Sequence, residues 1–296
     1  MTAIEARSDI FAATRPLLFS IAYRMLGTAS DAEDLVQDAY VRWLEAPETE
    51  VRAPRAYLAT IVTRLAINQL QSARNKRETY VGPWLPEPLV TEHAPDPSEP
   101  IELAESLSMA FLMMLERLSP TERAVLLLKD VFDFDYAEIA TILDKSEANC
   151  RQLLTRAKKH IGEPRARFDV DRAHADRLLD HFIEATRAGD IDGLLGVLAE
   201  DITLWADGGG KVPGAALRPV HGADSVARFV VQRAKAGAAA EGHHLRPTRI
   251  NGQPGFVIYD GNQARAALVL DVRGSRIHGI FAIANPDKLR ALALPA

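Results

Sequence analysis

The sequence predicts a multi-domain protein in which two all-α domains, the second a helix-turn-helix, are followed by an α+β domain. Three observations support this fold class. A proline-rich stretch at 81–100 separates two helical blocks, a helix-turn-helix pattern occupies 118–161, and after 170 helical periodicity gives way to alternating, glycine-punctuated runs. A chain of 296 residues with 47% hydrophobic residues is long enough for two or three packed domains.

The N-terminal block reads as a series of amphipathic helices. Apolar residues recur at helical spacing over 9–26, and Gly27 ends this first helix. Ser30 and Glu33 have the spacing of a capping box, which predicts a second helix over 31–45.

Charge changes sign abruptly within this block. Residues 31–50 carry seven acidic side chains against one basic side chain, Arg42, whereas 51–77 carry six basic and no acidic side chains. Neighbouring surfaces of opposite sign suggest two partners, a basic protein element and a nucleic acid. The alternative is a charge pattern that only keeps the surface soluble.

Residues 118–161 have the pattern of a helix-turn-helix. We expect its first helix at Tyr136–Leu143, a turn at Asp144 and Lys145, and a second helix capped by Ser146. Apolar residues at helical spacing should face the core, and these are Cys150, Leu154, Ala157 and Ile161. The opposite face carries amide and cationic groups that can reach base edges and phosphates. The DNA-binding candidates are therefore Asn149, Arg151, Gln152, Arg156 and Lys159.

Composition argues against several classes of protein. A net charge of −5 is not that of a protein that coats nucleic acid indiscriminately. The single cysteine, Cys150, excludes an intrachain disulfide and a cysteine-based zinc site; we expect it in the core, with a redox sensor as the alternative. The sequence has no metal-ligand cluster, phosphate-binding glycine loop, secretion signal or run of about 20 apolar residues. We therefore expect a cytoplasmic protein without a metal or cofactor.

The C-terminal part predicts two helices followed by an antiparallel sheet. Helical spacing covers 171–200, and a further helix is expected over 225–236. Alternating runs read as strands, and these are ITLWAD at 202–207, GFVIYD at 255–260, ARAALVLDV at 264–272 and RIHGIFAIA at 276–284.

Residues 9–161 resemble a bacterial sigma factor of the extracytoplasmic-function group. ASDAEDLVQDAYVRWLE looks like the segment that binds the clamp helices of RNA polymerase, which implies polymerase-binding roles for Asp34, Gln37, Asp38 and Arg42. PRAYLATIVTRLAINQLQSARNKR looks like the segment that opens and reads the −10 element, which implies DNA contacts by Asn68, Arg74, Lys76 and Arg77. The loop at 46–54 is similar to one that captures a flipped base, and 118–161 is similar to the domain that reads the −35 element.

Two positions depart from this family pattern. Leu153 stands where the family often has a basic residue, and Glu147 places a carboxylate in the first turn of the expected recognition helix. The carboxylate favours the helix dipole but would repel a nearby phosphate.

Residues 171–296 resemble the SnoaL-like, cone-shaped α+β fold, and three short segments resemble a sigma-factor subgroup that carries such a domain. The segments are WLPEP at 84–88, DGGGK at 207–211 and NPDKL at 285–289. The resemblance implies regulation in cis, in which the C-terminal domain packs against the linker and both sigma domains. The residues assigned to this interdomain regulation are Trp84, Leu85, Pro86, Asp207, Gly208, Gly209, Gly210, Lys211, Asn285, Pro286 and Asp287.

The expected domains are sigma region 2 at 1–80, a linker at 81–100, sigma region 4 at 101–165 and the SnoaL-like domain at 171–296. The expected partners are bacterial core RNA polymerase and promoter DNA, with a small-molecule ligand of the C-terminal domain as a further candidate. One alternative is a ligand-responsive helix-turn-helix regulator that never joins polymerase. Another is an isomerase or cyclase with a DNA-binding module, for which the candidate pocket groups are Trp205, Asp207, His221, His243, His244 and Asp260.

Overall fold

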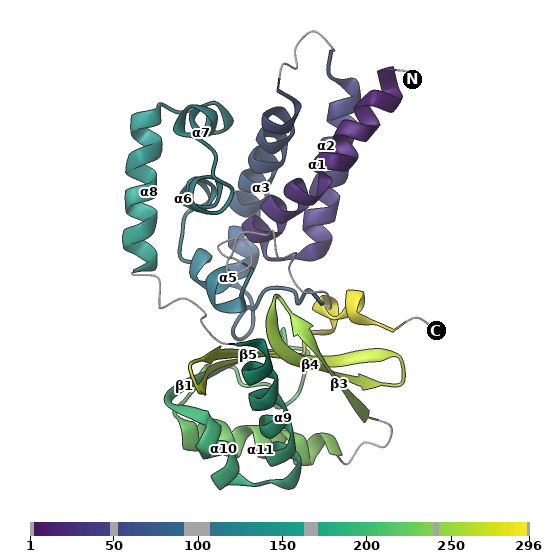
Figure 1. Ribbon diagram of the computed structural model, residues 1–296, viewed down its shortest axis with the longest axis vertical. Coiled ribbons are helices and arrows are strands. Elements are labelled where there is room, and N and C mark those ends of the chain that lie inside the picture. The colour runs from purple at the N-terminus through teal and green to yellow at the C-terminus, as the bar shows by residue number, and fades with distance from the viewer. Residues whose placement is uncertain (1–2, 48–52, 92–106, 163–170, 239–242, 295–296) are drawn as a thin grey trace. The chain divides into compact units, whose positions relative to one another are not determined.

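A computed structural model describes residues 3–47, 53–91, 107–162, 171–238 and 243–294 (Figure 1). The chain divides into two compact units. The first unit contains residues 1–78 and 111–165, and the second contains residues 79–110 and 166–296. The described part of the proline-rich segment is therefore packed into the C-terminal unit.

The first half of the helical unit contains α1 (Ala3–Leu26), α2 (Ala29–Glu45) and α3 (Pro54–Glu78). Gly27, with φ of 74°, ends α1 as predicted. The predicted capping box of Ser30 and Glu33 is wrong, because α2 already begins at Ala29 and Ser30 lies inside it. Thr28 is the extended N-cap residue, and the Glu33 carboxylate instead accepts a hydrogen bond from Arg15.

The second half of this unit contains the helix-turn-helix. Its elements are α5 (Met109–Leu115), α6 (Pro120–Leu126), the π-helical turn η2 (Leu127–Val131), α7 (Tyr136–Leu143) and α8 (Glu147–Ile161). The turn after α7 is made by Asp144 in the left-handed conformation, and the Ser146 hydroxyl accepts a hydrogen bond from the Asn149 amide at 3.2 Å. Both features agree with the prediction. Cys150, Leu154 and Ala157 are buried as expected.

The C-terminal unit is an α+β domain, as predicted. Three helices, α9 (Arg172–Ala188), α10 (Ile191–Val197) and α11 (Ala223–Ala238), share one apolar core with the sheet (Figure 1). The strands are β1 (Leu198–Asp207), β2 (Val220–His221), β3 (His243–Ile250), β4 (Gln253–Asp260), β5 (Gln263–Arg273) and β6 (Arg276–Ile283). Two short helical turns follow, η3 (Pro286–Lys288) and η4 (Arg290–Leu292).

The sheet has the order β2-β1-β6-β5-β4-β3 and is mixed, not fully antiparallel. The first long strand, β1, runs parallel to the last, β6, so the expectation of an antiparallel sheet is wrong at this pair. The pairing sets Asp207 beside Ile283, so the ends of both strands, and the segments that follow them, lie together. The prediction also missed β2 and β3, the two edge strands. No helix in the described part of the chain is long and apolar enough to cross a membrane.

Candidate functional site

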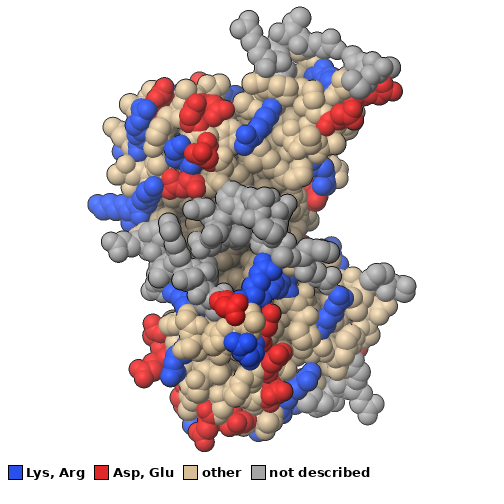
Figure 2. Space-filling model, in the orientation of Figure 1, with Lys and Arg blue, Asp and Glu red and all other residues tan. Residues whose placement is uncertain are grey.

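Helix α8 presents the polar face predicted from its sequence. The side chains of Asn149, Arg151, Gln152, Arg156 and Lys159 are all exposed. Lys and Arg side chains line the left edge of the view in Figure 2, where Figure 1 draws α8. Glu147 and Arg151 form an ion pair at 2.8 Å, so the carboxylate in the first turn is partly neutralised by one of the DNA-binding candidates.

The basic helix α3 carries the other DNA-binding candidates. Asn68 is exposed on it. The backbones of Arg74, Lys76 and Arg77 continue the helix, but their side chains lie outside the described part of the structure, as do residues 48–52 of the loop before α3.

Two other arginines of α3 are engaged with the helix-turn-helix. Arg64 donates from Nε to the carbonyl of Ile142 at 2.8 Å and from a terminal nitrogen to the carbonyl of Thr141 at 3.0 Å. These carbonyls belong to the last turn of α7, where four acceptors lack partners within the helix. The guanidinium of Arg55 lies 5.4 Å from the ring centre of Phe134, just before α7. Arg64 and Arg55 of α3 therefore bind α7 and the residues just before it within the helical unit.

Helix α2 exposes the predicted polymerase-binding residues together. Asp34, Gln37, Asp38 and Arg42 are all exposed and lie within three turns of one helix. Val41 is 53% exposed beside them, and the sequence analysis missed it. An apolar side chain in a charged surround is typical of a protein-binding surface.

A buried cluster joins the linker to the ends of β1 and β6. Asp207 has no exposed surface. Its carboxylate accepts hydrogen bonds from the hydroxyl of Tyr80, from the backbone amide of Leu85 at 2.9 Å and from the ammonium of Lys288 at 2.7 Å. Asn285 donates to the Tyr80 hydroxyl at 2.9 Å. We call Tyr80, Leu85, Asp207, Asn285 and Lys288 the linker clasp.

Lys288 supplies the counter-charge of the linker clasp. It is 7% exposed, and its ammonium also donates to the carbonyl of Leu85. The same ammonium lies 4.2 Å from the ring centre of Trp84 and 5.2 Å from that of Tyr80. A buried charge is stable only when it is paired and hydrogen-bonded, and here a carboxylate, a carbonyl and two aromatic faces surround it.

The linker clasp raises the pKa of Tyr80 well above its ordinary value. Burial is the largest cause, and the hydrogen bond to Asp207 and the negative charge of that carboxylate act in the same direction. Tyr80 therefore stays a neutral donor.

The three glycines after Asp207 are explained by close approach of the chain. A Cβ atom on Gly208 would lie 2.7 Å from the Cβ of Ala215. Gly209, with φ of 58°, has room for no side chain beside Asn285, and Gly210, with φ of 70°, would place a Cβ 3.0 Å from that of Val81 in the linker. The DGGGK segment thus lets the loop approach both Asn285 and the linker.

The structure brings most of the predicted regulatory residues together. Leu85, Gly209 and Asn285 lie around Asp207 in the contacts described above. Trp84 joins this group through Lys288, and Gly210 approaches Val81 of the linker. Lys211 forms an ion pair with Asp287. That ammonium holds the pKa of Asp287 below its usual range. Pro86 is buried and Pro286 begins η3. The sequence analysis missed Tyr80 and Lys288 as members of the cluster.

The six groups considered for a catalytic pocket do not converge. Asp207 is held in the linker clasp, Trp205 stacks on Phe281, and His221 bonds Thr203 on edge strand β2. His243 and His244 lie on β3 at the other edge, where His243 pairs with Asp260 in the sheet register. Five strand spacings, on the order of 24 Å, separate these edges. These six residues therefore do not form the pocket that the isomerase or cyclase alternative requires.

Comparisons with known proteins match the helical part to two regions of sigma-70 proteins. The family model described as Sigma-70 region 2 matches residues 10–76, and the one described as Sigma-70, region 4 matches residues 108–161.

The similarity to individual relatives extends over nearly the whole chain. It is 40% identical to the ECF RNA polymerase sigma factor SigJ of Mycobacterium tuberculosis, over 94% of this chain and 91% of that protein. It is 30% identical to the probable ECF RNA polymerase sigma factor SigI of the same species, over 96% and 95%. The crystal structure of M. tuberculosis SigJ matches with a TM-score of 0.73 and 38% identity, over 94% of this chain and 96% of that one.

Proposed function

Because this chain belongs to the family of ECF RNA polymerase sigma factors, which direct polymerase to promoters, we propose that its C-terminal α+β domain controls that activity in cis. The observation that carries the proposal is the linker clasp. Regions 2 and 4 are joined by the linker, and the linker is bound through the buried Asp207 and Lys288 pair. Release of the linker would then be a step in activation.

The stability of the clasp supports a closed resting state. Removing one partner of a buried ion pair costs about 3–5 kcal/mol, because the other charge is left buried without a partner. The two lysines of the regulatory segments offer a matched comparison: Lys288 is buried against Asp207, whereas Lys211 is half exposed against Asp287. Exposed ion pairs contribute little.

The test is promoter-directed transcription with core RNA polymerase at limiting protein concentration. We expect Lys288→Met to raise transcription about tenfold or more, since the docked form would bury the Asp207 carboxylate without its counter-charge and leave the Leu85 carbonyl without its donor. Lys211→Met should leave transcription near the wild-type level. The double variant Asp207→Asn/Lys288→Met tests the same expectation without leaving an unpaired charge in the protein interior. Equal transcription by wild type and both Lys288 variants would contradict control by the clasp.

The surface of α2 is our proposal for the polymerase-binding site, through Asp34, Gln37, Asp38 and Arg42. The exposed Val41 in the same face supports it. Asp34→Lys/Asp38→Lys should weaken binding to core polymerase, because opposed charges would become like charges. Asp180→Lys/Glu184→Lys on α9 makes the same charge change at the same spacing on exposed positions and is the control. Equal loss in both variants would show a general charge effect and contradict the assignment.

We propose α8, with Asn149, Arg151, Gln152, Arg156 and Lys159, as the reader of the −35 element, and Asn68, Arg74, Lys76 and Arg77 as contacts to the −10 region. The exposure of the α8 side chains and of Asn68 supports these roles. Since sigma factors act on polymerase in the cytoplasm, we expect this chain there.

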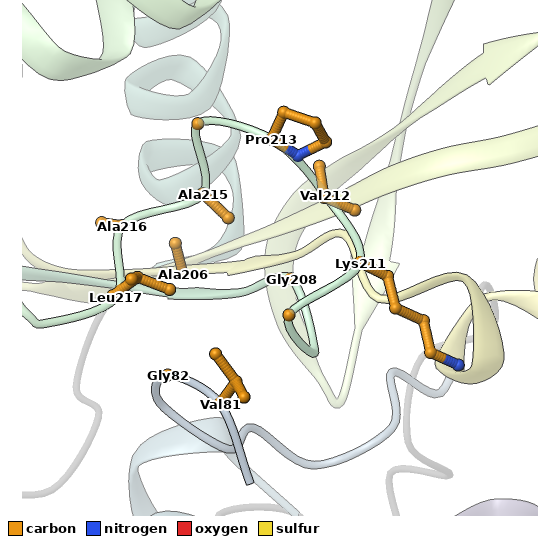
Figure 3. A pocket seen from close by; sticks show the side chains of 12 residues that line it. Val81, Gly82, Ala206, Gly208, Lys211, Val212, Pro213, Ala215, Ala216 and Leu217 are labelled. Carbon is orange, nitrogen blue, oxygen red and sulfur yellow. The ribbon is translucent and has the colours of Figure 1, made fainter.

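We also propose that the C-terminal domain binds a small-molecule ligand, because residues of the domain and the linker line a cavity. The cavity has a volume of about 350 Å³ and lies between linker residues Val81 and Gly82 and the loop at 206–217 (Figure 3). Most of its lining is small and apolar, and Lys211 extends away from it. A small apolar molecule bound there would contact the docked linker and should raise the thermal stability of wild type more than that of Val81→Asp. Equal shifts would contradict a site at the linker.

A further inference from the structure

The hairpin between β3 and β4 closes with a two-residue turn, Asn251–Gly252. Both residues have positive φ, 53° and 74°, which is the type I′ geometry that Asn-Gly favours. Asn251 is only 1% exposed, although hairpin tips ordinarily lie in solvent. Its backbone and side chain are engaged with the linker.

On the upstream side the turn binds the linker residues that follow Pro88. The amide of Leu89 donates to Oδ1 of Asn251 at 2.9 Å, and the amide of Asn251 donates to the carbonyl of Leu89 at 2.8 Å. Thr91 donates to the carbonyl of Arg249 at 2.8 Å, and its hydroxyl accepts from the amide of Gly252 at 3.0 Å. The linker thus lies along the end of β3 in an extended conformation, with Val90 bridged to Ile250.

On the downstream side the same hairpin binds the chain where region 4 begins. Nδ2 of Asn251 donates to the carbonyl of Leu107 at 3.1 Å. Oε1 of Gln253 accepts from the amide of Met109, the first residue of α5, at 2.9 Å. The first amides of a helix have no partner inside it, so Gln253 supplies from the C-terminal domain the acceptor that a capping residue usually supplies locally.

We propose that the Asn251–Gly252 turn is a second docking site for the linker, separate from the linker clasp. The side-chain amide of Asn251 binds both Leu89 and Leu107, which lie on either side of segment 92–106. A primary amide can both accept and donate, which a carboxylate cannot do. The linker clasp binds the chain at Tyr80, two residues after α3 ends at Glu78. Near the start of the region 4 match, Asn251 of the turn binds Leu107, and Gln253 beside the turn binds Met109. Each sigma region therefore has its own tether to the C-terminal domain.

The C-terminal domain binds the linker through backbone amides, and this explains the spacing of the prolines. Prolines at 83, 86 and 88 have no amide hydrogen, and the amides of Leu85, Leu89 and Thr91 between and after them are all bound by the C-terminal domain. Prolines leave few alternative donors and restrict the backbone to extended conformations, so the register of docking is fixed.

The test is hydrogen exchange of the full-length chain. Asn251→Gly keeps the positive φ of the turn but removes the side-chain amide. Exchange at Leu89, whose amide loses its acceptor, should become roughly tenfold faster. Exchange at Met109 should also rise, because the bond that holds Leu107 next to the Gln253 acceptor of Met109 is lost. Asn251→Asp keeps the acceptor for Leu89 and loses the donor for Leu107. We therefore expect faster exchange at Met109 with Leu89 close to wild type. Ser275→Gly, in the exposed turn between β5 and β6, is the control for added backbone freedom.

The docking site stands without the proposed function, and only its effect on transcription rests on that function. The outcomes of the two measurements therefore distinguish failure of the one from failure of the other. Wild-type exchange at Leu89 and Met109 in Asn251→Gly would overturn the docking site, as would equal acceleration in Ser275→Gly. Faster exchange together with higher promoter-directed transcription supports both the docking site and control in cis. Faster exchange with unchanged transcription supports the docking site and counts against control through the linker.

Discussion

At the scale of single residues, Asp207 determines how the linker is held. Its oxygens accept from a phenol, an ammonium and two backbone amides, the second being Gly209 at 3.0 Å. A carboxylate with this many donors is costly to remove, because every donor loses an acceptor at once. Asp207 therefore has a structural role in the linker clasp and is unsuited to act as a base.

Tyr80 gives the clasp a pH dependence whose sign follows from its raised pKa. Below pH 10 Tyr80 is neutral in both the docked and the released linker, so its contribution to docking is complete. Above pH 10 the released form loses the proton more readily, and docking weakens as the pH rises. A tyrosinate absorbance titration should show one tyrosine that ionises late, and Tyr80→Phe should remove that step. A late step that persists in Tyr80→Phe would assign it to another tyrosine.

The clasp was only partly predictable from single residues. Asp207, the three glycines and Asn285 stand in short segments that drew notice in the sequence, whereas Tyr80 follows a highly charged helix and carries no local signal. Lys288 resembles any surface lysine in a polar segment. Its role depends on the parallel pairing of β1 with β6, which brings residues about 80 positions apart to one end of the sheet. Such pairing cannot be read from periodicity.

At the scale of elements, the proposed DNA-binding roles predict that the contact between α3 and α7 opposes promoter binding. Elements centred at −35 and −10 lie about 25 base pairs apart, on the order of 80 Å along B-DNA. In the roles proposed above, helix α7 belongs to the part that reads one element and α3 to the part that reads the other, yet Arg64 bonds them directly. That contact must therefore break when both elements are bound.

Replacing Arg64 should shift the chain toward the separated form. Arg64→Lys keeps the positive charge but cannot make the forked pair of bonds to the carbonyls of Thr141 and Ile142. We expect about threefold to tenfold tighter binding of promoter DNA that carries both elements. A single-stranded −10 probe is the control, because it does not require the two parts to separate. Equal changes for both DNAs would show that Arg64 contacts the DNA itself.

Local patterns predicted elements well where caps and periodicity agree. Helices α7 and α8 begin and end as expected, because a side-chain cap precedes each helix and a residue with positive φ, Asp144 or Gly162, follows it. The strand β3, HHLRPTRI, was missed because it is polar and contains Pro247, as suits an edge. The Asn-Gly dipeptide after it is a strong hairpin signal that could have located it.

At the scale of the whole molecule, the linker is part of the C-terminal unit and not a spacer between independent domains. The described residues 79–91 contain no helix, as their proline content favours. The family resemblance predicted that the C-terminal domain packs against the linker and named Asp207. Local patterns could not identify the partners Asn251 and Lys288, which lie more than 100 residues away.

The two docking sites should act on one equilibrium. If both must open before regions 2 and 4 can separate, their free energies add and their effects on the open population multiply. Transcription by the double variant Asn251→Gly/Lys288→Met should therefore exceed wild type by the product of the two single effects, measured where the open population is still small. A double variant no more active than the better single variant would mean that one site does not restrain the linker.

Release of the linker also exposes part of a sheet edge, which lowers solubility. A proline in the edge strand β3 limits this effect. Once Leu89 and Thr91 leave, the end of β3 near Arg249 presents unpaired backbone groups, the kind of edge through which sheets of separate molecules associate. Pro247 interrupts this edge two residues earlier, because it offers no amide to an incoming strand. In the proposed open form, only a short stretch of the edge is therefore able to pair with another molecule, which limits self-association of the chain while the linker is released.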